Sequence, residues 1–217
     1  LSEPVVRGIL NATPDSFFSA SRVESEAAVA RRAEEILGQG GSIIDVGACS
    51  TRPGSTPVSE ADEWQRLRVM LRAIRHAFPD VILSLDTFRP AIARRAIEDY
   101  AVQIINDVSG GCAEMYALVA EKQVPYILTF ARPLSKEEDA VIEAVDFFVR
   151  ETDCLHRMGI SDIILDPGFG FGKTIEQNYA LLHGIDKLKM LHLPLLVGVS
   201  RKSMIYKPLD CTPEEAL

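Results

Sequence analysis

The stretch from Asp166 to Thr174 (Asp-Pro-Gly-Phe-Gly-Phe-Gly-Lys-Thr) follows directly on the apolar run Ile163-Ile164-Leu165. A β-branched run that ends in a carboxylate and is followed by glycines is typical of a buried strand that leads into a crowded turn. A carboxylate held in such a turn can bind the donor groups of a ligand. The stretch therefore predicts that Asp166 belongs to an active site.

Polar residues follow other apolar runs of the chain in the same way. The ends of these runs carry Asn11, Ser50-Thr51-Arg52-Pro53-Gly54, Asp86-Thr87, Asn106-Asp107 and Ser200-Arg201-Lys202-Ser203. Any one of them can be explained as a helix N-cap or a turn former, and this remains an adequate explanation for Asp15, Thr87, Asp107 and Ser203. Four such residues at one end of a sheet are harder to explain in that way. We predict that Asp86, Asn106, Asp166 and Lys202 face one shared site.

These residue types suit a flat, nitrogen-rich heterocycle. A carboxylate such as Asp166 can accept two parallel N–H bonds from an amino-pyrimidinone edge. Asn106 can donate to a ring nitrogen and accept from an amine, and Lys202 offers a positive charge to a ring carbonyl. Thr51 and Arg52 suit an anionic partner, although an ordinary surface turn would also explain their loop.

The glycine-rich stretch does not fit a phosphate-binding loop. Such a loop needs a glycine five residues before the Gly-Lys-Thr, and Pro167 stands at that position. We expect Lys173 and Thr174 to begin the next helix. Phe169 or Phe171 can either stack on a planar ligand or pack in the core.

Seven apolar runs alternate with amphipathic stretches along the chain. The expected strands are residues 5–11, 42–47, 81–87, 103–108, 126–130, 162–166 and 195–200, and the expected helices are residues 24–37, 60–77, 90–100, 113–122, 136–158 and 175–188. Nearly all-apolar strands separated by helices predict a parallel sheet covered by helices. Seven such units favour an α/β fold of the eight-stranded barrel type that lacks its eighth unit, with an open doubly wound sheet as the alternative. Residues 212–217 are expected to begin a helix that the chain does not complete.

Composition limits the class of protein. The chain has 217 residues, 47% hydrophobic and 25% charged, with a formal net charge of −8. We expect one domain over residues 1–217, because α/β barrels use roughly 200–250 residues for a single core. The negative charge argues against nucleic acid as a partner, and no apolar run approaches the roughly 20 residues that span a membrane. The four cysteines lie far apart in sequence, so we expect a reducing, cytoplasmic location rather than disulfides or zinc.

Taken together, these motifs resemble the dihydropteroate synthase family of the folate pathway. The matching segments are residues 8–17, 50–54, 86–87, 104–111, 166–174 and 196–203, and they occur in the order found in the family. The resemblance implies a β/α barrel that joins 4-aminobenzoate to a dihydropterin diphosphate and releases pyrophosphate, with Mg²⁺ assisting. It also suggests a homodimer packed through the late helices.

The resemblance implies a role for individual residues. Asp86, Asn106, Asp166 and Lys202 would hold the pterin, and Asn11 would help to coordinate the metal and the diphosphate. The remaining substrate contacts would come from Thr51, Arg52, Pro53, Phe171, Gly198 and Ser203.

The chain departs from the family pattern at several places. The family has an Arg-x-His motif at the end of its eighth strand, and this chain stops before it. After the fifth strand the family has a Met-His-Met-Arg-like segment, whereas this chain has Thr129-Phe130-Ala131-Arg132-Pro133. Two alternatives follow: a pterin- or folate-binding domain of the methyltransferase type, and an inactive paralogue.

Overall fold

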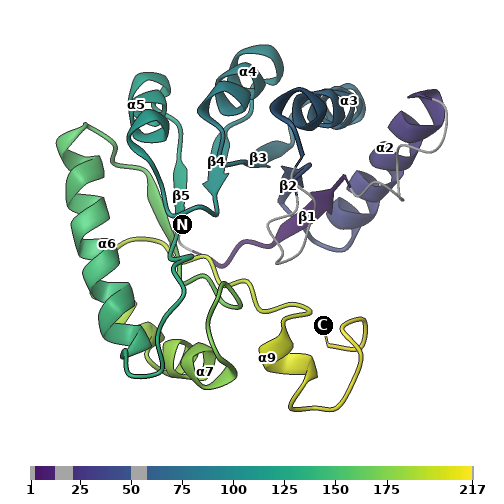
Figure 1. The fold of residues 1–217 in the computed structure, drawn as a ribbon. Helices are drawn as coiled ribbons and strands as arrows, with labels where there is room; N and C mark the ends of the chain where they lie inside the picture. Colours follow the sequence, from purple (N-terminus) through teal and green to yellow (C-terminus); the bar gives the residue numbers. More distant parts are fainter. Residues whose placement is uncertain (1–2, 13–21, 50–57, 217) are drawn as a thin grey trace. The chain divides into compact units, whose positions relative to one another are not determined.

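The computed structural model describes residues 3–12, 22–49 and 58–216, with no side-chain description for residues 22–24. Contacts within the chain divide it into two compact units, Leu1–Asn106 and Asp107–Leu217. Each unit is an alternation of parallel strands and helices (Figure 1). The predicted α/β class is therefore confirmed, while a single domain over residues 1–217 stays a prediction.

The first unit is built on four parallel strands. They are β1 (Arg7–Asn11), β2 (Ile43–Gly47), β3 (Ile82–Asp86) and β4 (Ile104–Asp107), and they pair in the order of the sequence. The helices α2 (Arg22–Gly38), α3 (Glu60–Ala77) and α4 (Pro90–Tyr100) connect them and cover one face of the strands (Figure 1). Right-handed β–α–β crossovers of this kind place the carboxyl ends of all strands at one edge.

Local sequence explains where these helices begin and end. The hydroxyl of Ser59 accepts the backbone N–H of Asp62 at 3.1 Å, which caps α3 at its expected first residue. Pro90 occupies the first turn of α4, where a missing N–H costs nothing, and Ala101 ends that helix in the left-handed conformation. Both helices have the bounds predicted from the sequence.

Alternation along the strands separates an apolar face from a polar one. Leu10, Val46, Leu85 and Ile105 are at most 2% exposed. They lie on the face that the helices cover, because a Cβ built on Gly8, two residues from Leu10, would lie 2.2 Å from Ile36 of α2. The intervening residues of each strand point to the opposite face.

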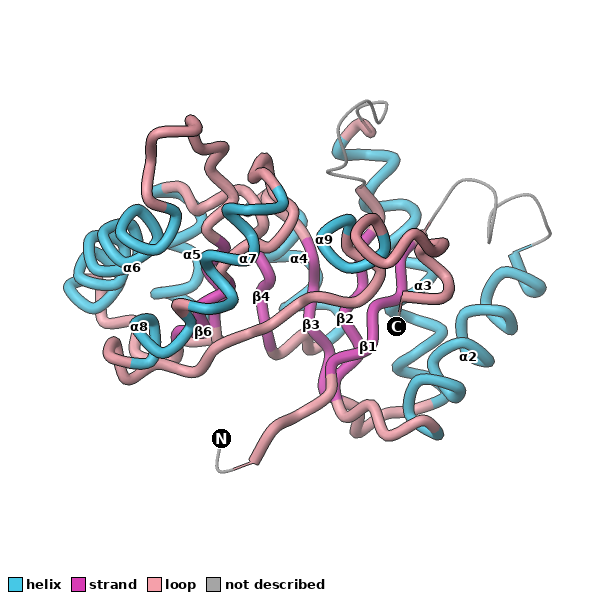
Figure 2. Tube along the Cα trace, turned by 90° about the horizontal axis from the view of Figure 1, so that it is seen from below, coloured by secondary structure: helices cyan, strands magenta, loops and turns pink. Residues whose placement is uncertain are grey.

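The second unit contains two paired parallel strands and five helices. The strands are β5 (Tyr126–Thr129) and β6 (Ile163–Asp166), and the helices are α5 (Ala113–Lys122), α6 (Ala140–Arg157), α7 (Ile175–His183), α8 (Ile185–Lys189) and α9 (Ser203–Tyr206). Helix α6 contacts both α7 and α8 (Figure 2). Phe130, Phe147 and Phe148 form an aromatic cluster with ring centroids 5.3–6.3 Å apart, which packs α6 against the end of β5.

Four expected elements differ from the structure. The helix expected over residues 175–188 is two helices, α7 and α8. Residues 195–200 make one isolated bridge, between Leu195 and Leu165, and form no strand. Helix α6 begins at Ala140 rather than at residue 136, because the carboxylate of Asp139 accepts the N–H groups of Val141 and Ile142 and caps it there. The expected last helix is a turn, in which the side chain of Glu215 folds back onto the N–H of Thr212.

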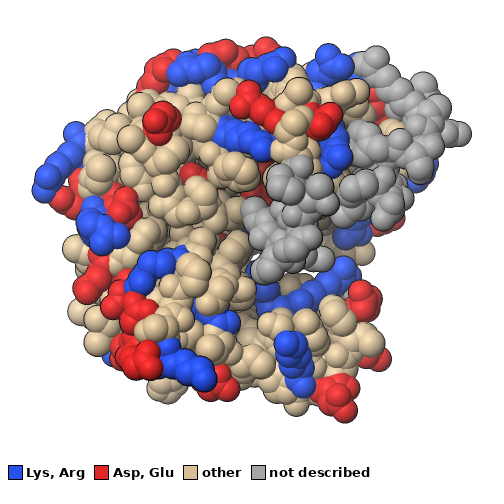
Figure 3. All heavy atoms as spheres, in the orientation of Figure 1, with Lys and Arg blue, Asp and Glu red and all other residues tan. Residues whose placement is uncertain are grey.

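The surface carries both signs of charge. On the face drawn in Figure 3, lysines and arginines lie next to aspartates and glutamates. Arg132, for example, pairs with Glu138 at 2.8 Å. In the part of the chain that the structure describes, no helix is both long and apolar enough to cross a membrane.

Candidate active site

Three of the predicted site residues lie in a single row across the first unit. Strand register pairs Asn11 with Gly47, Gly47 with Asp86, and Asp86 with Asn106. Neighbouring strands are about 4.8 Å apart, so the four residues form one line at the carboxyl ends of β1 to β4. The structure thus brings Asn11, Asp86 and Asn106 together on the face opposite the helices.

Gly47 leaves space between Asn11 and Asp86, its two neighbours in this row. A Cβ built on Gly47 would lie 2.6 Å from Oδ1 of Asn11 and 3.4 Å from Oδ2 of Asp86. The amide oxygen and the carboxylate therefore both border the position where a side chain of residue 47 would stand. Only glycine allows both groups to occupy this place.

Asn106 is held in one orientation by a buried network. Its Nδ2 donates to Oδ2 of Asp45 at 3.2 Å, and Oδ1 of Asp45 accepts the hydroxyl of Ser84 at 2.5 Å. Arg7 lies 3.4 Å from the same carboxylate. Because a carboxylate can only accept, this contact fixes which end of the Asn106 amide carries the nitrogen. Oδ1 of Asn106 is buried and, among the described residues, has no hydrogen-bond partner.

Sequence analysis missed Asp45 and Ser84. Asp45 is 2% exposed, and Ser84 is fully buried. A signal for Asp45 was present, because a carboxylate interrupts the apolar run Ile43-Ile44-Asp45-Val46. Buried charges in proteins are paired, so this position predicts a polar network inside the sheet.

A third residue that was not predicted from the sequence, Glu63 of α3, supports the loop after Asp86. Its carboxylate is fully buried, accepts the hydroxyl of Thr87 at 2.8 Å and forms an ion pair with Arg89. Arg89 also donates to the carbonyl of Val58 at 2.6 Å. Burial raises the pKa of Glu63, and the contacts with Thr87 and Arg89 oppose that rise. The ion pair connects α3 with the end of β3.

In the second unit, Asp166 stands at the end of β6 opposite Thr129 of β5. Oδ1 of Asp166 accepts the N–H of Gly168 at 2.8 Å, and Oδ2 lies 3.4 Å from the hydroxyl of Thr129. These contacts orient the carboxylate, which is 8% exposed. Thr129 belongs to the segment that departs from the family pattern, and it contributes a hydroxyl directly beside Asp166.

Lys202 and Phe171 lie together in the same unit. Nζ of Lys202 is 5.0 Å from the centroid of the Phe171 ring, and a Cβ built on Gly170 would lie 3.6 Å from that Nζ. The loop after β6 and the segment before α9 therefore meet at these residues. The structure thus places Lys202 and Phe171 next to the loop that begins at Asp166.

For the remaining predicted residues the structure gives fewer contacts, or none. Gly198 is exposed, and a Cβ built on it would meet no atom within 4 Å. Ser203 is the first residue of α9 and is half-buried. Thr51, Arg52 and Pro53 lie outside the described residues.

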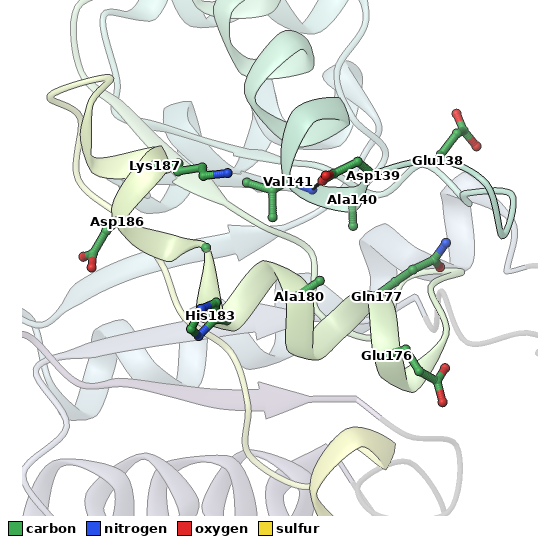
Figure 4. Close-up of a pocket in the computed structure, with 11 residues that line it drawn as sticks. Glu138, Asp139, Ala140, Val141, Glu176, Gln177, Ala180, His183, Asp186 and Lys187 are labelled. Carbon is green, nitrogen blue, oxygen red and sulfur yellow. Dashed lines mark hydrogen bonds between the residues drawn. The ribbon is translucent and has the colours of Figure 1, made fainter.

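One hollow of the second unit contains none of the predicted residues. It has a volume of about 630 Å³ and lies between α6, α7 and α8, where Val141, Gln177, His183 and Lys187 line it (Figure 4). The side chains of Glu176 and Asp186 point outward from it (Figure 4). This hollow lacks the strand-end carboxylates and amides, so we do not assign the chemistry to it.

Comparison with known proteins identifies the class. The sequence profile described as "Pterin binding enzyme" matches residues 7–216. The dihydropteroate synthase of Synechocystis sp. is 40% identical over 216 residues, which cover 94% of this chain and 74% of that protein.

Solved structures agree with the sequence match. The dihydropteroate synthase from Clostridium difficile, determined in the presence of pteroic acid, superposes with a TM-score of 0.91 at 31% identity and covers 99% of this chain and 83% of that one. The Xanthomonas albilineans dihydropteroate synthase with 4-aminobenzoic acid gives a TM-score of 0.87 at 34% identity, covering 100% of this chain and 80% of that one.

The chain therefore belongs to the pterin-binding enzymes and, within them, to the dihydropteroate synthases. It is accordingly a transferase of folate biosynthesis. The family and the barrel-type α/β fold class expected from the sequence are both confirmed.

Proposed function

We propose that this chain joins 4-aminobenzoate to 6-hydroxymethyl-7,8-dihydropterin diphosphate, giving 7,8-dihydropteroate and pyrophosphate. The observation that carries the proposal is the row of Asn11, Asp86 and Asn106 at the strand ends, with the buried Oδ1 of Asn106 left open to a donor. An unpaired buried acceptor costs about 1–3 kcal/mol, which a ligand N–H would recover. The relatives determined in the presence of pteroic acid and with 4-aminobenzoic acid support the same substrates.

Each polar group has a place in pterin recognition. Asp166 would accept the paired N–H groups of the amino-pyrimidinone edge, and its contacts with Gly168 and Thr129 keep it oriented for this. Asn106 would accept through its open Oδ1. Lys202 would offer its ammonium to the ring carbonyl, and Asp86 would accept from a further ring N–H.

The reaction needs position more than a strong base. The bond between the pterin methylene carbon and the diphosphate oxygen breaks, and the leaving group takes the electron pair. The pterin ring delocalises the positive charge that remains, and the carboxylates of Asp86 and Asp166 stabilise that charge electrostatically. The amine of 4-aminobenzoate then forms the new C–N bond and loses a proton, which requires it to be held in line with the carbon.

The row in the first unit fits Mg²⁺ as an assisting ion. Mg²⁺ prefers oxygen ligands and is commonly bound by one or two protein groups together with waters and substrate phosphates. Among the described residues there is no group of three or more His, Cys, Asp or Glu side chains that could hold a metal. Oδ1 of Asn11 remains accessible because Gly47 has no side chain. It could therefore serve as the single protein ligand of such an ion. When bound there with the diphosphate, Mg²⁺ would neutralise charge on the leaving group.

The other substrate contacts remain proposals of the family resemblance. Thr51, Arg52 and Pro53 would bind the diphosphate and the aminobenzoate. Phe171 and Ser203 would line the aminobenzoate pocket, and the position of Phe171 beside Lys202 is consistent with this. Gly198 would make a further substrate contact.

The assembly and location are proposals as well. We propose a cytoplasmic homodimer that packs through the late helices and binds neither nucleic acid nor membrane. Ile142 on α6 is 55% exposed, and Met190, directly after α8, is 74% exposed. Both border an apolar hollow of about 380 Å³, which supports a contact at these helices.

Calorimetry separates this function from its alternatives. The purified protein should bind the pterin diphosphate in a Mg²⁺-dependent manner and should bind 4-aminobenzoate once pyrophosphate and pterin are present. Binding of a methylated reduced folate without binding of the pterin diphosphate would instead indicate a methyltransferase-type domain. Pterin binding that is indifferent to Mg²⁺ and never followed by turnover would indicate an inactive paralogue.

A further inference from the structure

The sequence predicted that Lys173 begins a helix. In the structure its side chain instead turns back into the loop after β6. Thr174 caps α7 instead, in a capping box with Gln177. Nζ of Lys173 donates to the carbonyl oxygens of Phe130 at 2.6 Å, Gly168 at 3.1 Å and Phe171 at 3.3 Å. These three bonds use all three donors of an ammonium group.

The loop that this ammonium holds has a demanding backbone. Gly168, Gly170 and Gly172 all have positive φ, at 68°, 84° and 61°. Gly168 packs so closely on the end of β5 that a Cβ there would lie 2.2 Å from the carbonyl oxygen of Phe130. Three glycines in such conformations lose much entropy on ordering, so hydrogen bonds from one ammonium to the carbonyls of the loop help to keep it in one shape.

The loop that Lys173 contacts connects two of the predicted site residues. It begins at Asp166, whose Oδ1 accepts the N–H of Gly168, and it includes Phe171, whose ring faces Nζ of Lys202. The loop is also tied from α7, where Asn178 accepts the N–H of Gly170 at 2.7 Å. A change in its shape would therefore move groups on both sides of the pterin position.

The environment of Lys173 lowers its pKa toward neutral pH. Burial lowers its pKa to about 8, the carboxylate of Asp166 opposes that lowering, and the cations of Lys202 and Arg132 add to it. The ammonium also lies 4.5 Å from the centroid of the Phe130 ring. These are the charged groups that face it from the loop, from α9 and from the end of β5.

We propose that Lys173 is a positioning residue, which holds the loop of residues 168–172 in the shape that presents Asp166 and Phe171 to the substrates. Its three hydrogen bonds tie the carbonyl oxygens of Gly168 and Phe171 to that of Phe130. Removal of these bonds therefore loosens the loop and weakens pterin binding. The proposal rests on the proposed function for its consequence but not for the contact itself.

Two measurements on the wild type and on Lys173→Met test it. The first is amide hydrogen exchange of residues 168–172 at pH 7 and pH 9.5, each corrected for the intrinsic rate at that pH. We expect exchange in the variant to be about tenfold faster than in the wild type at pH 7. The pKa of Lys173 in the closed loop, about 8, lies below its ordinary value of 10.5, so loss of the proton does not open the loop, and exchange in the wild type should remain the slower at pH 9.5. The second is the KM for the pterin diphosphate at pH 7, which should be about tenfold higher in the variant, with kcat changed much less.

Lys189→Met is the matched control. Lys189 pairs with Asp186 at 2.8 Å on the surface of the same unit, and both side chains are exposed. This control should behave like the wild type in both measurements. Unfolding by urea, followed by circular dichroism, establishes that each variant is folded, and Lys173→Gln replaces Lys173→Met in both measurements if the latter does not fold.

The possible outcomes distinguish failure of this proposal from failure of the proposed function. Loop exchange, or a KM for the pterin diphosphate, that is the same in the wild type and in Lys173→Met would overturn the proposal. Exchange requires no substrate, so a wild-type protein without turnover would refute the proposed function while the exchange result still decided whether Lys173 holds the loop.

Discussion

Asp45 holds Asn106 through a 3.2 Å contact from Nδ2 to Oδ2, and Oδ1 of Asn106 is left buried without a donor from the described part of the chain. The two residues come from β2 and β4, with Ser84 of β3 bound to the same carboxylate. Asp45, two residues before Gly47 in β2, thus determines which atom of the Asn106 amide can accept a hydrogen bond from a ligand.

The first prediction concerns Asp45→Asn. The new amide can present an N–H to Asn106, which then has no reason to keep Oδ1 toward the ligand, and Arg7 loses its counter-charge. We expect the Kd for a pterin, measured by calorimetry, to rise about tenfold or more. Asp162→Asn, at an exposed position just before β6, should bind as the wild type does. Unchanged pterin affinity in Asp45→Asn would show that Asn106 is oriented by something else.

The second prediction concerns the buried ion pair of Glu63 and Arg89. Glu63→Ala leaves a partly buried guanidinium and the hydroxyl of Thr87 without their acceptor, and we expect a loss of about 3–5 kcal/mol in the free energy of unfolding. Urea unfolding at pH 7 measures this loss. A loss below about 1 kcal/mol would mean that the pair does not support the end of β3.

Glu63→Gln gives the pH dependence of the same site. The folded pKa of Glu63 lies above its ordinary value of 4.5, so the folded state binds more protons than the unfolded state above that pH. The contribution of Glu63 to stability is thus complete below pH 4.5 and declines as pH rises through the folded pKa. The stability of the wild type relative to Glu63→Gln should fall over that interval, and a rise would contradict the raised pKa.

The third prediction concerns the space at Gly47. Gly47→Ala would place a methyl group 2.6 Å from Oδ1 of Asn11 and 3.4 Å from Oδ2 of Asp86, so Asn11 must move. We expect kcat/KM to fall about tenfold or more and the Mg²⁺ concentration needed for half-maximal rate to rise. Gly38→Ala, where a Cβ meets no atom within 4 Å, is the control. Equal kinetics of Gly47→Ala and wild type would remove Asn11 from the metal and diphosphate site.

The fourth prediction concerns the stability of the whole molecule at alkaline pH. Lys173 has a folded pKa of about 8 against an ordinary value of 10.5, so between these values the unfolded state binds more protons. Stability then rises with pH, with a slope of at most about 1.4 kcal/mol per pH unit. The stability of the wild type relative to Lys173→Met should accordingly increase from pH 8 to pH 10, in urea unfolding at each pH. A constant or falling difference would show that the Lys173 ammonium is not desolvated.

The sequence predicted those features that depend on local pattern. Apolar runs that end in polar residues located β1 to β6, and the helices that begin with Ser59 and Pro90 have the expected bounds because capping is a local interaction. The row of Asn11, Asp86 and Asn106 followed from the rule that parallel strands share their carboxyl edge.

Features that depend on tertiary contacts were not predictable. Glu63 looks like any acidic residue in the first turn of a helix, and only the fold shows that it is fully buried against Thr87 and Arg89. Lys173 was expected to start a helix, because nothing in the local sequence reveals that three carbonyls, one of them from residue 130, surround its ammonium. The expected strand of residues 195–200 was wrong for a related reason, since an apolar run makes a strand only where a neighbour pairs along its length.

The most direct test of the central claim is the rate of dihydropteroate formation by the wild type and by Asp166→Asn, with both substrates and Mg²⁺ present. Substitution of the carboxylate by an amide keeps its size but removes the paired acceptor for the pterin edge. We expect the wild type to form dihydropteroate and pyrophosphate in equal amounts, and the variant to lose at least about a hundredfold in kcat/KM. A wild-type protein that forms no dihydropteroate, or an Asp166→Asn variant as active as the wild type, would contradict the account.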